Sequence, residues 1–164
     1  MISSNLSSLE IEFSTEALKA NMLRLESEWD DYQASRNRDG VYAYLTAVFE
    51  LTLWWKHERK DLEYARRALW LKGHRSIATM PEPFASIILC TADGTKVDDK
   101  TRSKWSRVLR YAAEYKDLDE PLQDFIRRKG GINSCAARYT RRLGRTAKHS
   151  AKIKSRRLFV AGKT

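Results

Sequence analysis

The chain has 164 residues, enough for one domain or for a small domain with a helical extension. Its 7 Gly and 3 Pro are too few for the turns of a β-sandwich or barrel, and its 5 Trp, 7 Tyr and 5 Phe exclude wholesale disorder. The 2 Cys exclude a disulfide-stapled scaffold and indicate a reducing compartment. We therefore expect an all-α fold.

The N-terminal region is expected to hold one amphipathic helix. Residues 1–13 lack the basic and apolar regions of a signal peptide and are predicted to be irregular. Ser14 or Thr15 can cap the helix through a side-chain oxygen. The helix carries an apolar seam with alternating spacings of four and three residues: Leu18, Met22, Leu25, Trp29 and Tyr32. This seam fits either the core of the chain itself or the interface of a homodimer.

The most apolar segment of the chain is predicted to be the central helix of the molecule. Residues 41–59 are apolar nearly all the way round when they are placed on a helix, as expected for an element buried on every side. The apolar stretch is shorter than the roughly 20 residues that cross a bilayer, so we expect no membrane partner.

Two shorter helices complete a predicted helical body that spans residues 14–92. Asp61 can cap the first of them, and Gly73 is a suitable stop after it. Residues 83–91 fit the second helix, with a buried strand over residues 87–89 as the alternative.

The charge is distributed unevenly along the chain. Residues 1–50 carry 4 Lys and Arg against 9 Asp and Glu, whereas residues 101–164 carry 18 against 5. No acidic residue follows Asp124. A basic end on a weakly acidic body favours a polyanionic partner, and a solvated tail that aids solubility is the alternative.

Residues 98–145 are predicted to form a basic tri-helical unit. Asp98 can cap its first helix, which has an apolar stripe along one side. The opposite side of this helix is predicted to contact phosphates through four cations: Lys100, Lys104, Arg107 and Arg110.

A glycine turn joins the second and third helices of this unit. Asp119 can cap the second helix, Gly130 and Gly131 must end it, and residues 133–145 form the third. A helix, a three-residue turn and a short helix with small residues near its start is the geometry of a helix-turn-helix motif. An ordinary helical hairpin, or a basic surface with another binding geometry, is the alternative.

Residues 133–145 would then be the recognition helix. The side chains predicted to reach the nucleic acid are Asn133, Ser134, Arg138, Arg141, Arg142 and Arg145. Arg pairs with guanine and Asn with adenine through two hydrogen bonds in the major groove, so these residue types favour sequence-specific contacts.

Residues 146–164 are predicted to be a flexible tail that lacks fixed structure in isolation. Small residues interrupt its charges, and no segment in it is long enough to form a core. The cations expected to contact phosphates or to enter a minor groove are Lys152, Lys154, Arg156 and Arg157.

The sequence carries no complete catalytic or metal-binding motif. His57, His74 and His149 are isolated, and Cys90 lies 45 residues from Cys135, so the sequence offers no four-ligand zinc set. Phosphate-binding glycine motifs are absent as well. We therefore expect no enzymatic activity, no metal and no cofactor.

The segment Asp93-Gly94-Thr95 is predicted to be a turn. A phosphatase of the DxDGT type needs a nucleophilic aspartate two residues earlier, where this chain has Thr91. A nuclease site at Asp93 and Lys96 is the catalytic alternative, but a turn explains both residues without chemistry.

The sequence therefore predicts a cytoplasmic DNA-binding protein, associated with the nucleoid if its source is bacterial. Its role would be that of a transcription regulator or accessory factor, with duplex DNA favoured over RNA as the partner. Two alternatives use the same basic surface: an RNA-binding protein, and a non-catalytic protein-interaction or inhibitor module. Double-stranded RNA hides its major groove, so contacts to RNA would be to phosphates or loops.

Overall fold

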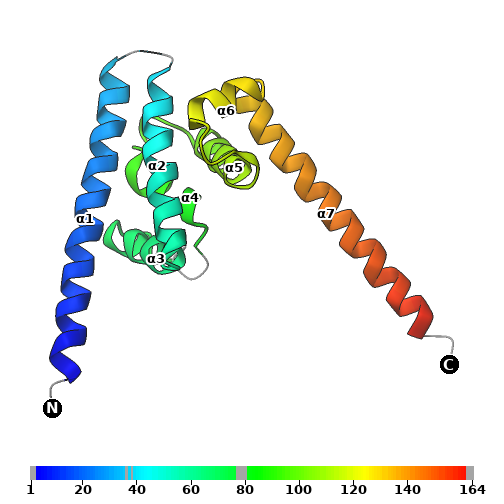
Figure 1. Cartoon of the computed structure of the whole chain (residues 1–164), viewed down its shortest axis with the longest axis horizontal. Helices are drawn as coiled ribbons and strands as arrows, with labels where there is room; N and C mark the ends of the chain where they lie inside the picture. Colours follow the sequence, from blue (N-terminus) through cyan, green and yellow to red (C-terminus); the bar gives the residue numbers. More distant parts are fainter. Residues whose placement is uncertain (1–2, 36, 38, 77–80, 162–164) are drawn as a thin grey trace.

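The computed structural model describes residues 3–35, 37, 39–76 and 81–161, and it describes side chains within these ranges from residue 15 to residue 152. Over the described residues the chain forms seven α-helices and no strand, which confirms the all-α fold (Figure 1). No helix within these ranges has both the length and the apolar character that a bilayer crossing requires.

The helices follow one another with short connections. Their bounds are α1 Ser3–Ser35, α2 Gly40–His57, α3 Asp61–Leu71, α4 Pro83–Thr91, α5 Asp99–Tyr115, α6 Leu122–Arg128 and α7 Ile132–Ala161. The prediction of a helix over 83–91 is confirmed, and the strand alternative is wrong.

Helix α1 begins much earlier than its sequence suggested. The prediction that residues 1–13 are irregular, with Ser14 or Thr15 as the cap, is wrong because the helix starts at Ser3. Residues 3–14 contain neither Gly nor Pro, so no residue in this segment breaks the helix.

The apolar seam of α1 packs into the core of the same chain. α1 and α2 form an antiparallel pair (Figure 1), and the Trp29 ring lies 5.3 Å from the Tyr44 ring and 6.0 Å from the Trp105 ring, measured between centroids. Leu18, Met22, Leu25 and Trp29 are each at most 3% exposed, and Tyr32 packs against them. The intramolecular alternative is therefore right, and the predicted dimer interface through this seam is wrong, because the same side chains cannot fill both.

One hydrophobic core joins all seven helices. It includes Trp105 of α5, Phe125 of α6 and Tyr139 of α7 together with the buried side chains of α1 to α4. The helices of the predicted tri-helical unit thus share their core with the helical body, and the division into separate domains stays a prediction.

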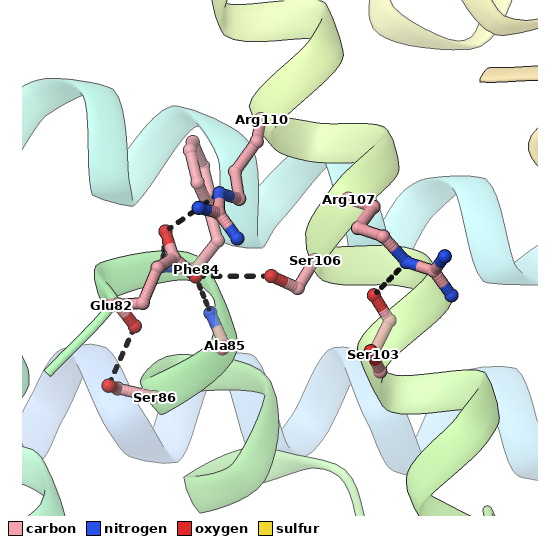
Figure 2. A network of polar contacts seen from close by, with 8 residues as sticks. All are labelled: Glu82, Phe84, Ala85, Ser86, Ser103, Ser106, Arg107 and Arg110. Atoms are coloured by element: carbon pink, nitrogen blue, oxygen red, sulfur yellow. Dashed lines mark hydrogen bonds and ion pairs between the residues drawn. The ribbon is translucent and has the colours of Figure 1, made fainter. Parts of the chain in front are cut away.

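Two of the helix starts are fixed by carboxylate caps. Asp98 accepts a hydrogen bond from the Thr101 backbone N–H at 2.8 Å, as predicted for α5. At α4 the cap is Glu82, which accepts from the Phe84 and Ala85 N–H groups at 3.3 and 2.7 Å (Figure 2).

The other predicted caps are wrong by a few residues. α3 is preceded by Lys60, so Asp61 is its first residue and not its cap. α6 is preceded by Pro121, so Asp119 lies in the loop before it. α7 begins at Ile132, one residue before the predicted start of the third helix at residue 133.

The glycine turn before α7 forms as predicted. Gly130 and Gly131 both have φ near +92°, a backbone conformation that glycine adopts without steric cost. The Gly131 N–H donates to the Ile126 carbonyl at 2.8 Å and closes the end of α6.

Helix α7 is longer than its sequence suggested. We expected a helix that ends near Arg145 and a tail without fixed structure, but the helix continues to Ala161. Gly144 is the one strong helix breaker in this segment, and a single Gly costs only about 1 kcal/mol relative to Ala inside a helix.

Candidate nucleic-acid interface

Helix α7 consists of an anchored base and an exposed arm. Its base packs on α5 through Cys135, Ala136 and Tyr139, which are all buried. Every side chain from Thr140 to Lys152 is exposed, and Figure 1 shows the C-terminal part of α7 extending away from the other six helices. Thirty residues at 1.5 Å each give α7 a length of about 45 Å.

The charges of α7 are gathered on one side. Between Ile132 and Ala161 the helix has 9 Lys and Arg and no Asp or Glu. At about 100° per residue, six of these cations fall within a sector of about 120°. We call them the basic face of α7: Arg138, Arg141, Arg142, Arg145, Lys148 and Lys152.

The remaining predicted contacts of α7 are placed differently. Ser134 is half-buried and lies at the N-terminal end of the basic face, whereas Asn133 is exposed about 140° away from Arg138 around the helix axis. The side chains of Lys154, Arg156 and Arg157 lie outside the described residues.

Two of the four cations predicted on α5 are engaged by neighbouring helices. Arg107 donates to the Thr140 hydroxyl of α7 at 3.0 Å and to the Ser103 carbonyl at 3.3 Å. Arg110 lies over the Tyr139 ring, 4.9 Å from its centroid, and its Nε is 3.8 Å from a carboxylate oxygen of Glu82. Figure 2 shows the two guanidinium groups pointing in different directions from α5.

These contacts give Arg107 and Arg110 a role in helix packing. Arg110 bridges α4, α5 and α7, and Arg107 ties α5 to α7. Lys100 is exposed and Lys104 is half-exposed, so they are the members of the predicted α5 set that remain turned to solvent.

A hollow of about 300 Å³ lies where α7 crosses α5. It is lined by Tyr111, Tyr115, Arg138, Arg141, Arg142 and Arg145, and we call it the arginine hollow. The Arg142 guanidinium lies 5.5 Å from the centroid of the Tyr115 ring and forms an ion pair with Glu114. The Tyr111 and Tyr115 rings are 4.8 Å apart.

The four arginines of this hollow were predicted from the sequence as contact residues, whereas its two tyrosines were not. Tyr111 and Tyr115 continue the line of Lys100, Lys104 and Arg107 on α5, with spacings of four, three, four and four residues. This spacing is the sequence signal for the two tyrosines, because it places aromatic side chains after cations along one face of the helix.

The cations of α7 differ from those of α6 in their partners. Arg128 of α6 makes two hydrogen bonds to Glu120, at 2.8 and 2.7 Å, and these bonds lower the pKa of the Glu120 carboxyl. Arg127 of α6 lies 3.0 Å from Asp39. On the basic face of α7, by contrast, Arg142 is the member that forms an ion pair within the described part of the chain.

Asp93, the residue of the catalytic alternative, has a structural role in the turn after α4. Asp93 accepts hydrogen bonds from the backbone N–H and the hydroxyl of Thr95, both at 2.8 Å, and these bonds lower the pKa of its carboxyl. The segment therefore forms the predicted turn. Burial raises the pKa of the Cys90 thiol to about 12. The described residues contain no group of three His, Cys, Asp or Glu arranged to hold a metal ion.

Comparison with known proteins gave no match to a protein-family model, to a curated protein or to a solved structure. The function proposed below therefore depends on the residues of this chain alone.

Proposed function

We propose that this protein binds nucleic acid, with duplex DNA as the preferred partner, and that it acts as a regulator or accessory factor. The observation that carries the proposal is the basic face of α7, a row of six exposed cations on a helix that projects from the body. Five of these six cations form no ion pair with a described carboxylate, Arg142 being paired with Glu114, and are free to replace the counterions that surround phosphates. Release of these counterions is the main source of affinity for nucleic acids.

The shape of α7 supports DNA as the partner. The major groove of B-DNA is about 12 Å wide and admits an α-helix, and a continuous basic helix that leaves its domain is one of the known ways to occupy it. In a helix-turn-helix docking, Arg138 and Arg141 near the glycine turn would face base edges, while Lys148 and Lys152 would contact phosphates further along. Duplex RNA has a deep and narrow major groove, so it would meet the same face only through phosphates.

The first experiment measures the salt dependence of binding to a 20-base-pair DNA duplex and to an RNA duplex of the same sequence. If about six phosphates are neutralised, log K should fall with log[salt] with a slope of roughly −5. A flat salt dependence, or no binding to either duplex at low salt, would contradict the proposal. Equal binding to both duplexes would favour the RNA-binding alternative, or a binding mode that depends on charge alone and does not distinguish DNA from RNA.

A charge-matched pair of variants separates the basic face from the net charge. The double variant Lys148→Glu/Lys152→Glu should weaken binding to every duplex sequence and make the salt slope shallower by about two. The control, Lys56→Glu/Lys96→Glu, changes the net charge equally at exposed positions outside α7 and should bind as wild type does. If both variants lose affinity equally, then overall charge and not this face is responsible.

A further inference from the structure

The arginine hollow differs from the rest of the basic face in shape and chemistry. It is concave, with a volume of about 300 Å³, and two tyrosine rings of α5 form part of its lining. A volume of that size is at the lower end of the pockets that enclose small ligands. Further along, the described side chains of α7 are all exposed.

Three arginines of the hollow are suited to a phosphate group. Arg138, Arg141 and Arg145 lie on successive turns within a sector of about 60°. None of the three forms an ion pair with a described carboxylate, whereas Arg142 is occupied by Glu114. A guanidinium is a planar fork of N–H donors that matches the spacing of phosphate oxygens, so guanidinium groups without carboxylate partners on one side of a hollow favour this anion.

The opposite wall of the hollow offers an aromatic platform. Tyr115 is 45% exposed, and the central carbon of the Arg142 guanidinium is 5.5 Å from the centroid of its ring. Tyr111 is 8% exposed and is held between Tyr115 and the Phe125 ring, whose centroid is 5.8 Å away. An exposed aromatic ring that is backed by buried rings and flanked by a guanidinium is a surface on which nucleobases stack.

Phosphate-binding groups and a base-stacking ring in one hollow define a nucleotide site. We propose that the arginine hollow binds one unpaired nucleotide of the nucleic acid, with its phosphate between Arg138, Arg141 and Arg145 and its base on Tyr115. The nucleotide must be unpaired because a base inside a duplex has both faces covered by its neighbours. This inference rests on the proposed function, and it adds a preference for duplex ends and single-strand junctions over continuous duplex. At such an end Arg138 and Arg141 would hold the phosphate of the unpaired nucleotide, in place of the base edges that they would face on continuous duplex.

The test uses the full chain and three probes at one salt concentration: a blunt 20-base-pair DNA duplex, the same duplex with one unpaired 3′ adenosine nucleotide, and adenosine monophosphate. The overhang duplex should bind about tenfold more tightly than the blunt one, the gain expected from one stacked base. Adenosine monophosphate should compete for this gain, and inorganic phosphate at the same concentration should compete less.

Three tyrosine variants test whether the tenfold gain in affinity for the overhang duplex depends on the Tyr115 ring. Tyr115→Ala should remove the tenfold gain and leave the affinity for the blunt duplex unchanged, whereas Tyr115→Phe should keep the gain because the ring remains. The matched control is Tyr42→Ala, which removes a tyrosine that also lies beneath a guanidinium, that of Arg127, but outside the hollow. This control should keep the gain, and the far-ultraviolet circular dichroism of each variant should equal that of wild type.

Each outcome separates this inference from the proposed function. Equal binding of the blunt and overhang duplexes overturns the nucleotide site and leaves nucleic-acid binding intact. A Tyr115→Ala variant that still binds the overhang duplex more tightly than the blunt one has the same meaning. Competition by inorganic phosphate as effective as that by adenosine monophosphate overturns the stacking platform. Binding of adenosine monophosphate without binding of either duplex supports the site and contradicts the proposed function, and no binding of any probe overturns both.

Discussion

The carboxylate of Glu82 joins two helices of the fold, α4 and α5. Its carboxylate caps α4 through the Phe84 and Ala85 N–H groups, and it also accepts from the Ser106 hydroxyl of α5 at 3.1 Å (Figure 2). Arg110 lies 3.8 Å from the same group. A carboxylate that serves donors from two helices fixes both the start of α4 and its position against α5.

Replacing Glu82 therefore tests how much this junction contributes to stability. Glu82→Ala removes the α4 cap and leaves the Ser106 hydroxyl without its acceptor, so the free energy of unfolding should fall by about 1–3 kcal/mol. Urea denaturation measures this change. The control is Glu50→Ala, at an exposed position of α2, which should stay within about 0.5 kcal/mol of wild type. A loss as small as that of the control would show that the carboxylate is dispensable.

The two cysteines provide a second test at the scale of single residues. Burial raises the pKa of the Cys90 thiol to about 12 and also raises that of Cys135, although the nearby Arg138 guanidinium opposes the second effect. The thiolate is the nucleophile, so both side chains should be unreactive in the folded protein at pH 8, well below the pKa of Cys90. Labelling with a disulfide reagent should proceed at the rate of unfolding, and both thiols should react at once in concentrated urea. Rapid labelling of the folded protein would contradict the burial of these groups.

At the scale of helices, sequence periodicity predicted the middle of the chain well. The starts or ends of α2, α3, α4 and α5 lie close to the predicted positions because a short-range signal marks each of them, such as Asp98 at α5 and Gly73 after α3. The turn at Gly130 and Gly131 was predictable for the same reason, since two successive glycines allow a left-handed backbone.

The two ends of the chain were not predictable in this way. Helices α1 and α7 extend beyond the segments that carry a core-facing stripe, and local sequence does not reveal whether a polar, breaker-free segment continues an existing helix. The arginines of the candidate site were predictable from charge and spacing. The spacing along α5 places Tyr111 and Tyr115 on its cationic face, but it does not place them beside Arg138, because only the crossing of α5 by α7 brings these residues together.

The exposed arm of α7 contains one residue that weakens the helix. A Cβ added at Gly144 would have no atom within 4 Å, so Gly144→Ala should stabilise the arm by about 1 kcal/mol at no steric cost. If the arm binds DNA as a helix, this preorganisation should raise the affinity up to about fivefold and increase the helical signal at 222 nm. Weaker binding by Gly144→Ala would instead show that the bound arm bends or unwinds at this residue.

The same Gly-to-Ala substitution in the turn between α6 and α7 should lower the stability of the protein. Gly131 has φ near +92°, and a side chain there strains the backbone even though the space is open. Gly131→Ala should therefore destabilise the protein by about 1–2 kcal/mol. The pair distinguishes a glycine that the fold requires from one that it tolerates.

The whole molecule separates its charges in space. The acidic side chains are concentrated on α1, which has 7 Asp and Glu against 2 Lys and Arg, and the basic arm of α7 leaves from the opposite side of the molecule (Figure 1). Such an arrangement orients the molecule as it approaches a polyanion, because the arm is attracted and the acidic helix α1 is repelled. Steering of this kind acts on the association rate and weakens with ionic strength.

The separation of arm and core leads to a prediction for two contrasting variants. Deletion of residues 146–164 removes no described side chain that is buried, since the core ends at Tyr139, so the midpoint of thermal unfolding should change by only a few degrees. The deletion should weaken duplex binding for every sequence and make the salt slope shallower, while leaving any sequence preference unchanged, because phosphate contacts carry no base information.

Leu25→Ala leaves the arm intact but opens a cavity at a residue 1% exposed, so it should lose about 2–5 kcal/mol of stability. Thermal unfolding and binding assays on both variants measure these effects, and a fall of more than about 10 °C in the truncated protein would mean that the arm packs against the body in solution.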